Sequence, residues 1–198
     1  MEDGTLEWTK SRLRRSIRER LRAVPDAELA TATTGVLSRL QAAEHLWQRP
    51  GTVALFGGLR GEPDLVQGLL PWLRARGWRT VLLAVAGEQL HPAEVRGEPD
   101  CRRGVHGVWE PQPGCPLLPA SELDLILVPG LAFGSGDGSR LGRGGGYYDR
   151  FLATPGLRAR RIGVACEWQV SDRVPCESHD IRVQELITEV HHRVVEPG

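Results

Sequence analysis

The chain has 198 residues, of which 40% are hydrophobic and 25% are charged. This length and composition support one sizeable core, so we expect residues 1–198 to form a single globular domain. Twenty-five basic residues balance twenty-five acidic ones, which excludes an overall field attracting nucleic acid or an anionic membrane, and no apolar run approaches the ~20 residues that span a bilayer.

The first predicted element is an amphipathic helix over residues 10–23. Its apolar residues recur every four positions at Leu13, Ile17 and Leu21, and arginines occupy the remaining surface. Such charges ordinarily form a solvated face. The alternative is that the helix is an arm that binds nucleic acid. The zero net charge of the chain and the absence of an aromatic stacking pattern both argue against this alternative.

Helical and extended patterns then alternate along the chain. We predict helices over 27–47 and 64–76 and strands over 52–56 and 79–85. This order of strand, helix and strand is typical of parallel sheets, in which helices connect neighbouring strands.

The second half continues the alternation after an irregular stretch. Repeated prolines between 86 and 119 exclude long helices there, so short strands and turns are expected. We then predict strands at 124–128, 161–166 and 186–190, with a helix from about Tyr147. The whole pattern predicts an α/β fold: a Rossmann-like, three-layer domain with a mostly parallel sheet, helices on both faces and ligands at the carboxyl ends of the strands.

The cysteines and the N-terminus bear on the compartment. The four cysteines form neither a C-x-x-C pair nor a zinc-like spacing, and no apolar signal-peptide core precedes Trp8. We therefore expect a cytoplasmic, soluble protein with no membrane partner, and we expect a monomer.

The glycine-rich segment after the strand at 124–128 carries the strongest functional signal. Glycines at 142, 144, 145 and 146 flank Arg143 and precede Tyr147-Tyr148-Asp149. Glycine adopts positive φ without penalty, so consecutive amide groups can converge on a phosphate, with a helix start behind them. A tight surface connection without a ligand is the alternative. The spacing is neither that of a Walker loop nor that of a G-x-G-x-x-G dinucleotide site.

Charged residues elsewhere complete a possible phosphate site. Lys10 and Arg14, one helical turn apart, could reach the phosphates together. Asp149 and Asp180 could hold Mg²⁺, which proteins usually bind through one or two carboxylates together with substrate oxygens. Asp149 could instead favour its helix through the dipole, and Asp180 could be a cap or turn residue.

Three further residues suit a binding slot or have ordinary structural roles. Glu62 follows a strand end, where it could hold a substrate amine or simply form a turn. Phe56 and Trp109 could be core residues or the walls of a slot for a flat ring. The adjacent His191 and His192 are too isolated in the sequence to predict a metal site.

Several motifs together resemble the 5-formyltetrahydrofolate cyclo-ligase (5,10-methenyltetrahydrofolate synthetase) family. The closest match runs from Leu127-Val-Pro-Gly-Leu-Ala-Phe133 through Gly138-Ser-Arg-Leu-Gly-Arg-Gly-Gly-Gly-Tyr-Tyr-Asp-Arg-Phe151. It extends to Lys10-x-x-Leu-Arg14, the Glu62 segment, Trp109 to Pro113, and Pro175-Cys-Glu-Ser-His-Asp180. The resemblance covers nearly the whole chain and is weakest between 87 and 104.

The resemblance implies an ATP- and Mg²⁺-dependent ligase of one-carbon metabolism. Such an enzyme cyclises 5-formyltetrahydrofolate to 5,10-methenyltetrahydrofolate by phosphorylating the formyl oxygen, and it releases ADP and phosphate. Phosphoryl transfer of this kind requires positioning and charge neutralisation more than a covalent nucleophile.

The resemblance also assigns roles to residues of this sequence. The triphosphate would be bound by Lys10, Arg14, Gly142, Arg143, Gly144, Gly145, Gly146, Tyr147 and Tyr148. The catalytic groups would be Lys10, Arg14, Arg143 and Tyr148. The folate would contact Phe56, Glu62, Trp109, Tyr147 and Tyr148. The metal ligands would be Asp149 and Asp180.

Some positions depart from the family pattern. Phe56 stands where a tyrosine is usual, Pro63 replaces a β-branched residue, and Gln184 replaces an aspartate. None lies in the glycine segment, so ATP and Mg²⁺ binding is less affected than folate contact. The alternative function is a nucleotide-binding regulatory module that binds ATP without turnover.

Overall fold

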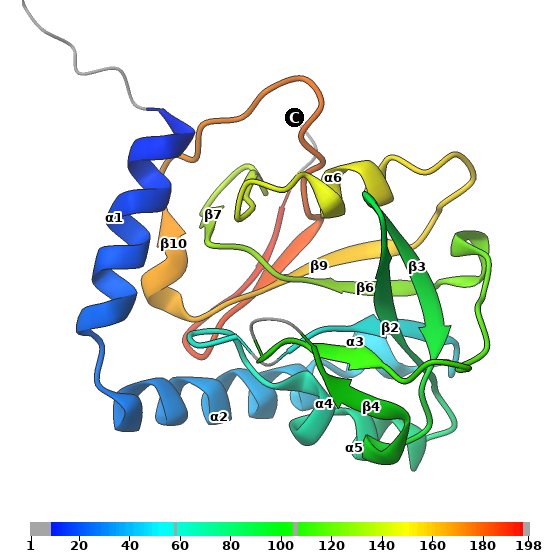
Figure 1. The fold of residues 1–198 in the computed structure, drawn as a ribbon. Coiled ribbons are helices and arrows are strands. Elements are labelled where there is room, and N and C mark those ends of the chain that lie inside the picture. Colours follow the sequence, from blue (N-terminus) through cyan, green and yellow to red (C-terminus); the bar gives the residue numbers. More distant parts are fainter. Residues whose placement is uncertain (1–8, 58, 105–106, 196–198) are drawn as a thin grey trace, which may run out of the picture.

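A seven-stranded sheet lies at the centre of the molecule (Figure 1). The structure is a computed structural model and describes residues 9–57, 59–104 and 107–195. The order of strands is β12-β11-β9-β6-β1-β2-β3, and the five inner strands are parallel while β3 and β12 are antiparallel edges. The strands are β1 (Thr52–Leu55), β2 (Arg79–Ala86), β3 (Gln89–Glu94), β6 (Leu125–Val128), β9 (Arg160–Val164), β11 (Glu185–Ile187) and β12 (His192–Val194).

The central strands are buried on both faces, as the apolar runs in the sequence predicted. Every residue of β1 and β6 is buried. Val53 pairs with Leu125 and Ala54 with Ile126, so that neighbouring apolar side chains line each face of the sheet. The predicted strands at 52–56, 79–85, 124–128 and 161–166 are confirmed.

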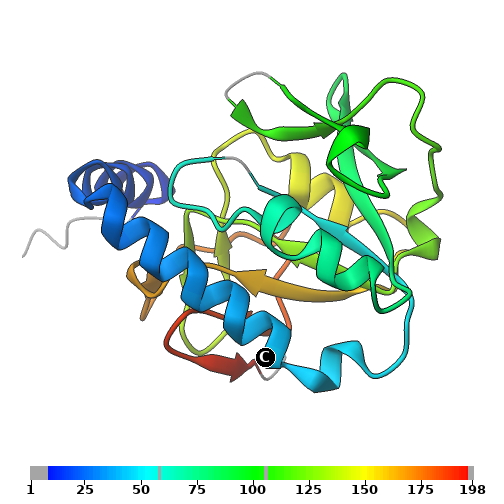
Figure 2. The same ribbon diagram turned by 90° about the horizontal axis from the view of Figure 1, so that it is seen from below.

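Helices cover both faces and make the three-layer arrangement that was predicted. One face packs against α2 (Asp26–Ala42), α3 (Glu44–Trp47), α4 (Leu65–Gly68) and α5 (Leu70–Arg74), which Figure 2 shows in front of the sheet. The other face packs against α6 (Tyr147–Leu152) through Phe151 and Leu152. No helix of the described residues has both the length and the apolar character needed to cross a membrane.

Two small sheets extend this layout. The hairpin of β4 (Cys101–Arg103) and β5 (Trp109–Pro111) lies in the irregular region, where short strands were expected. A second sheet has the order β10-β7-β8, with β7 (Ala132–Gly134), β8 (Arg140–Leu141) and β10 (Val170–Ser171). Short 3-10 turns occur at Glu98–Asp100, Ala120–Glu122 and Glu167–Gln169.

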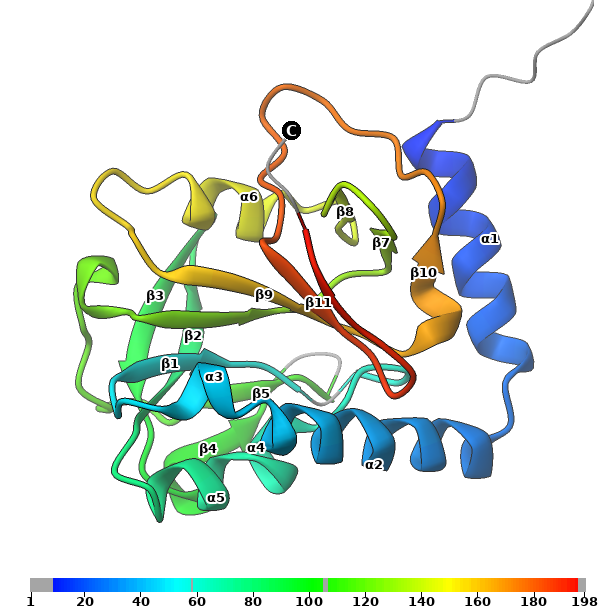
Figure 3. The same ribbon diagram turned by 180° about the vertical axis from the view of Figure 1, so that it is seen from behind.

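The N-terminal helix α1 (Lys10–Ala23) stands beside the sheet rather than over a face (Figures 1 and 3). Thr9 caps it by accepting the amide of Arg12 at 3.3 Å. Leu13 and Ile17 are buried in a separate cluster with Leu131, Ala132 and Leu141. This packing places the basic helix next to the segment that follows β8.

Three predicted elements differ from the structure for local reasons. The helix at 27–47 is interrupted at Ala43, and the helix at 64–76 divides before Pro71, which has no amide hydrogen to donate. The strand at 186–190 ends at Ile187, because the Thr188 hydroxyl accepts the amides of Val190 and His191 and turns the chain into β12.

Candidate active site

A cavity of about 260 Å³, called the apolar cavity for the character of its walls, lies at the carboxyl ends of β1 and β6. Gly57 follows β1 and Pro129 follows β6, so the ends of two parallel strands open into it, as expected for this fold class. Its other walls come from the glycine segment and α6. The lining side chains include Leu55, Phe56, Glu62, Leu83, Val85, Leu90, Val108, Trp109, Arg140, Arg143, Tyr147, Tyr148 and Asp149.

Aromatic side chains form part of the apolar wall. Phe56 and Trp109 are both buried members of the hydrophobic core, which confirms the core interpretation, and both also line the cavity. The indole Nε1 of Trp109 donates to Asp64 at 2.8 and 2.9 Å, and the Arg103 guanidinium lies 3.6 Å from the indole ring centroid. These contacts fix the orientation of the indole ring.

A buried carboxylate and an arginine face each other at the cavity. Glu62, with 6% of its side chain exposed, accepts from Arg143 Nη2 at 2.7 Å and from Nε at 3.2 Å. Burial raises the pKa of Glu62, and the Arg143 guanidinium offsets this only in part. The Arg143 guanidinium therefore lies at the cavity as the ion-pair partner of Glu62 and is not an isolated charge in the glycine segment.

The glycine loop, residues 142–146, is held by arginines from outside it. Arg14 Nε donates to the Gly142 carbonyl at 2.9 Å, Arg18 donates to the carbonyl of Arg143 at 3.2 Å, and Arg150 donates to that of Gly145 at 3.0 Å. Arg14 and Arg18 on the basic face of α1 thus have structural contacts to the glycine loop.

The loop keeps its amide groups for other partners. Gly144 and Gly146 have φ of 114° and 67°, which residues with a Cβ rarely adopt. Among the described residues, no protein acceptor is found for the amides of residues 142–146. With the carbonyls held by arginines, these amides are the hydrogen-bonding groups that the loop can offer to an anion.

Asp149 forms an ion pair that the sequence did not predict. Arg140 Nη2 lies 2.6 Å from Asp149 Oδ1, and only 2% of the Arg140 side chain is exposed. The amide of Ile181 also donates to Asp149 Oδ1, at 3.4 Å. Because this amide follows Asp180 directly, the structure brings the two predicted metal ligands into one neighbourhood.

Asp180 in turn binds Lys10. Their side chains are 2.6 Å apart, and Glu177 lies 3.2 Å from the same ammonium group. Burial opposes the charged form of Asp180, but the bond to Lys10 outweighs it and lowers the pKa of Asp180. Desolvation likewise opposes the charge of Lys10, and its carboxylate partners outweigh this and raise the pKa of Lys10.

A second, more open cavity of about 510 Å³ lies beside the N-terminus of α1. It is lined by Thr9, Lys10, Ser11, Arg14, Pro175, Cys176, Glu177 and His179. Arg14 lines this cavity and also binds Gly142, which lines the apolar cavity. The walls of the two cavities are therefore in contact at the glycine loop.

The predicted site residues gather around these two cavities. Those at the apolar cavity are Phe56, Glu62, Trp109, Gly142, Arg143, Gly145, Gly146, Tyr147, Tyr148 and Asp149. Those at the second are Lys10 and Arg14. Gly144 lies next to the Arg14 guanidinium, and Asp180 lies against Lys10.

Two residues of the site had no role in the sequence-based prediction. Arg140 lies just before the glycine loop, in a short strand beside the apolar Leu141. A charged residue at that position is the sequence signal that could have identified it as part of the site. Asp64 caps α4 through the amides of Val66 and Gln67, and no sequence signal indicated that its carboxylate also reaches Trp109.

Comparison with known proteins gives consistent relatives. The family model for the 5-formyltetrahydrofolate cyclo-ligase family matches residues 7–189. The chain is 35% identical to the 5-formyltetrahydrofolate cyclo-ligase of Mycolicibacterium smegmatis, covering 91% of this chain and 93% of the relative. It is 26% identical to the mouse (Mus musculus) 5-formyltetrahydrofolate cyclo-ligase, covering 93% and 96%.

Solved structures agree on the fold. The 5,10-methenyltetrahydrofolate synthetase of Aquifex aeolicus superposes with a TM-score of 0.81 at 29% identity, covering 96% of this chain and 94% of that one. A 5,10-methenyltetrahydrofolate synthetase from Mycoplasma pneumoniae gives a TM-score of 0.74 at 22% identity, covering 91% and 98%, and shows the same fold.

Proposed function

Because the chain belongs to the 5-formyltetrahydrofolate cyclo-ligase family, we propose that it converts 5-formyltetrahydrofolate to 5,10-methenyltetrahydrofolate with ATP and Mg²⁺, releasing ADP and phosphate. The observation that carries this proposal is the meeting of two unlike cavities at the glycine loop. One is apolar and aromatic with a buried carboxylate, and the other has cationic groups on its wall.

The apolar cavity suits the pterin ring of the folate. Its apolar and aromatic walls can hold a flat ring, while Glu62 can accept hydrogen bonds from ring N–H and amino groups. In the free protein, Arg143 binds that carboxylate. Folate binding would then release the Arg143 guanidinium from Glu62 and make it available to the phosphates of the second substrate.

The glycine loop suits the triphosphate. Its amides have no protein acceptor among the described residues, and Arg14 is already in contact with Gly142. Backbone donors and arginine forks together are the usual means by which proteins bind phosphate groups. A triphosphate lying along the loop would have Lys10 and Arg14 on one side and the apolar cavity on the other.

The donor set also fits Mg²⁺. Asp149 Oδ1 is used by Arg140 and Ile181, which leaves Oδ2 for a metal, and Asp180 Oδ2 is used by Lys10, which leaves Oδ1. Two carboxylate oxygens together with phosphates and waters are what this hard cation prefers. When bound, Mg²⁺ would neutralise charge on the phosphates.

The reaction depends mainly on how the two substrates are positioned relative to each other. The formyl oxygen attacks the γ-phosphorus and ADP leaves; N10 of the folate then bonds to the formyl carbon and loses its proton to water, and the carbon–oxygen bond breaks to release phosphate. Burial, followed by the nearby Glu62 charge, raises the pKa of Tyr148. Tyr148 therefore remains a phenol at neutral pH and can donate a hydrogen bond to the transferred group.

The proposal also includes the cellular compartment and the oligomeric state of the protein. All four cysteines are free thiols, as in a reducing cytoplasm, where the reaction would occur. Every group assigned above comes from one chain, so a monomer is sufficient for the activity. Its partners are then the two small substrates, without nucleic acid or membrane.

The direct test is spectroscopic. Purified protein is incubated with 5-formyltetrahydrofolate, ATP and Mg²⁺, and we expect the near-ultraviolet absorbance of the methenyl product to rise. Omitting ATP or chelating the magnesium should each abolish the rise. A flat trace at high protein concentration would reject the proposed activity.

A regulatory module that binds ATP without turnover is the second candidate, and the observation behind it is Phe56. Phe56 lies in the cavity wall, where its ring is packed and offers no hydroxyl. This candidate predicts saturable ATP binding by calorimetry together with the flat trace above. Turnover by the wild-type chain excludes it.

A further inference from the structure

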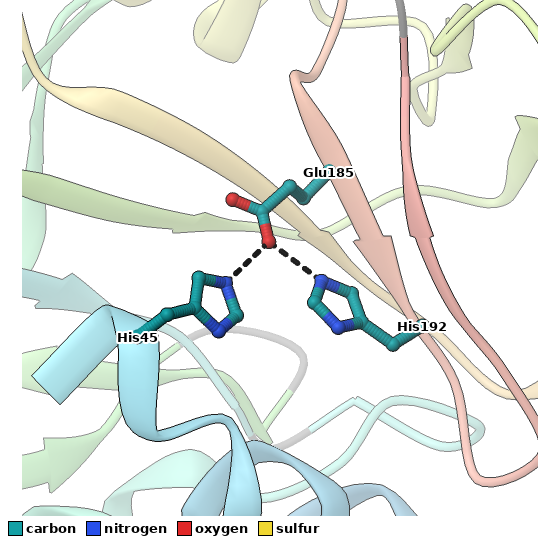
Figure 4. A group of neighbouring side chains, drawn as sticks. All are labelled: His45, Glu185 and His192. Atoms are coloured by element: carbon teal, nitrogen blue, oxygen red, sulfur yellow. Dashed lines mark hydrogen bonds and ion pairs between the residues drawn. The ribbon is translucent and has the colours of Figure 1, made fainter.

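A buried carboxylate with two histidines lies outside both cavities. Glu185 begins β11, His192 begins β12, and His45 lies on α3 (Figure 4). His45 Nε2 is 2.8 Å and His192 Nε2 is 2.6 Å from the same oxygen, Glu185 Oε2. The three side chains come from parts of the chain about 140 residues apart, so only folding assembles them.

The spacing of the three groups matches that of a metal site. Their ligand atoms all lie within 4.8 Å of one another, the only set of at least three such groups within the described residues. Two imidazoles on one tetrahedral Zn²⁺, with Zn–N bonds of roughly 2.0–2.1 Å, have ring centroids about 5 Å apart. The His45 and His192 centroids are 5.0 Å apart, with 17° between the ring planes.

The ring orientation supports the same interpretation. Figure 4 shows both imidazoles directing a nitrogen at the same carboxylate oxygen, one from α3 and one from β12. Ligand atoms around a tetrahedral zinc ion are about 3.3 Å apart, so the two nitrogen–oxygen contacts of 2.8 and 2.6 Å need to lengthen by only about 0.5 and 0.7 Å. Side-chain movements of that size do not require the strands to separate.

Burial and charge also suit a cation. Glu185 is fully buried, and Arg160 contacts its other oxygen, Oε1. That ion pair leaves Oε2 for the histidines and places a charged neighbour beside the other carboxylate oxygen. His45 and His192 keep 38% and 28% of their side chains exposed, so an ion can enter from solvent.

We propose that His45, Glu185 and His192 bind one divalent transition-metal ion of the Zn²⁺ class, which fastens α3 to the C-terminal hairpin of β11 and β12. Two imidazoles and a carboxylate are ligands that Zn²⁺ accepts, with a fourth position open to water. None of the three residues lines either cavity. The ion would therefore stabilise the fold without entering the reaction.

The test uses chelator-treated full-length protein titrated with Zn²⁺. We expect one ion per chain by calorimetry and a thermal midpoint that rises with Zn²⁺ concentration. His192→Ala and His45→Ala should each weaken binding at least about 100-fold, since even loss of an outer-shell partner costs roughly 10–100-fold. Glu185→Gln should do the same, but it leaves Arg160 without its carboxylate, so the histidine variants decide the matter.

His191→Ala is the matched control. His191 is adjacent in sequence, but its ring contacts Glu167 rather than Glu185, so this variant should bind Zn²⁺ like the wild type. Co²⁺ in place of Zn²⁺ should give visible bands without a thiolate charge-transfer band. Such a band would place the ion on cysteine. That result, or unchanged affinity in both histidine variants, would overturn the proposal, as would the absence of saturable Zn²⁺ binding.

Discussion

The rim of the apolar cavity and the C-terminal hairpin of β11 and β12 both contain paired charged residues, but the pairs have different roles in the two regions. At the rim, the Glu62–Arg143 and Arg140–Asp149 pairs both line the cavity. At the hairpin, Glu185 binds His45, His192 and Arg160, while Glu167 binds Arg193, His191 and Thr188. The hairpin carboxylates lie away from both cavities.

The difference shows that pairing alone does not identify a functional charge. A carboxylate surrounded by protein donors holds neighbouring helices and strands together, and its removal mainly lowers the free energy of unfolding. A pair that borders a cavity can exchange its partner for a ligand, and its loss costs activity. The predictions below separate these two roles.

The largest effect is expected at the rim, for Asp149→Asn. Turnover should fall roughly 100-fold to 1000-fold, the range for losing one charge-stabilising group in an active site. Because Arg140 is buried and loses a charged partner, the free energy of unfolding should also fall by about 1–3 kcal/mol. Steady-state kinetics and urea denaturation measure the two quantities.

Asp172→Asn is the control for Asp149→Asn, because Asp172 is exposed and lies outside both cavities. It should leave turnover and stability unchanged. Near-normal turnover of Asp149→Asn would remove this residue from the proposed metal site.

The next effect concerns the folate side of the rim. Glu62→Gln should raise KM for 5-formyltetrahydrofolate roughly 10–100-fold, the cost of losing a buried charged hydrogen bond, with little change in KM for ATP. Burial raises the pKa of Glu62, so the carboxylate should take up a proton, and the wild-type protein should lose affinity for the folate, at a pH above the usual glutamate pKa. The variant should not show this pH dependence. Glu88→Gln, at an exposed position, is the control, and an equal rise in both KM values would contradict the assignment.

A smaller effect is expected at the nucleotide side. Arg14→Ala should raise KM for ATP by about tenfold, because it removes both a cation and the contact that holds Gly142. Arg12→Ala changes an exposed arginine of the same helix and should have no effect. If the two variants change KM for ATP by the same factor, α1 contributes only positive charge near the site and no specific contact.

The smallest effect on activity is expected at the hairpin. Burial opposes the charge of Glu167, but Arg193 and Thr188 outweigh it and lower the pKa of Glu167 to about 2. An acid whose pKa is lowered in the folded state adds stability above its unfolded pKa, and that stability is lost as pH falls from about 4.5 toward 2. Glu167→Gln should therefore lose about 1–3 kcal/mol at neutral pH, keep its kcat and show less acid sensitivity in that window. Denaturation curves at several pH values measure this, and a large fall in kcat would contradict the structural role.

Much of the fold could be predicted because its causes are local. The apolar runs of β1 and β6 required burial on both faces, and the spacing of Leu13 and Ile17 required a helix with one buried side. The breaks at Ala43 and Pro71 and the turn at Thr188 were missed. They depend on local details within longer helical or extended patterns, such as the amide hydrogen that Pro71 lacks and the bonds that the Thr188 hydroxyl accepts.

Candidate site residues could be named from the sequence, but their partners could not. The glycine loop was evident because glycines and an arginine between a strand and a helix are adjacent in the chain. That Arg143 faces Glu62, or that Lys10 faces Asp180, depends on contacts between residues far apart in sequence. His192 was set aside as isolated for the same reason, since His45 and Glu185 approach it only in the folded chain.

The sequence by itself determined the α/β class, the order of strands and helices along the chain, and a phosphate-suited loop, because each follows from neighbouring residues and their periodicity. The tertiary structure alone decided which charges meet. It brought α1 to the glycine loop, joined two cavities there and placed two histidines on one buried carboxylate. Ion pairs and cavities depend on distances across the fold, and these are set by how the layers pack.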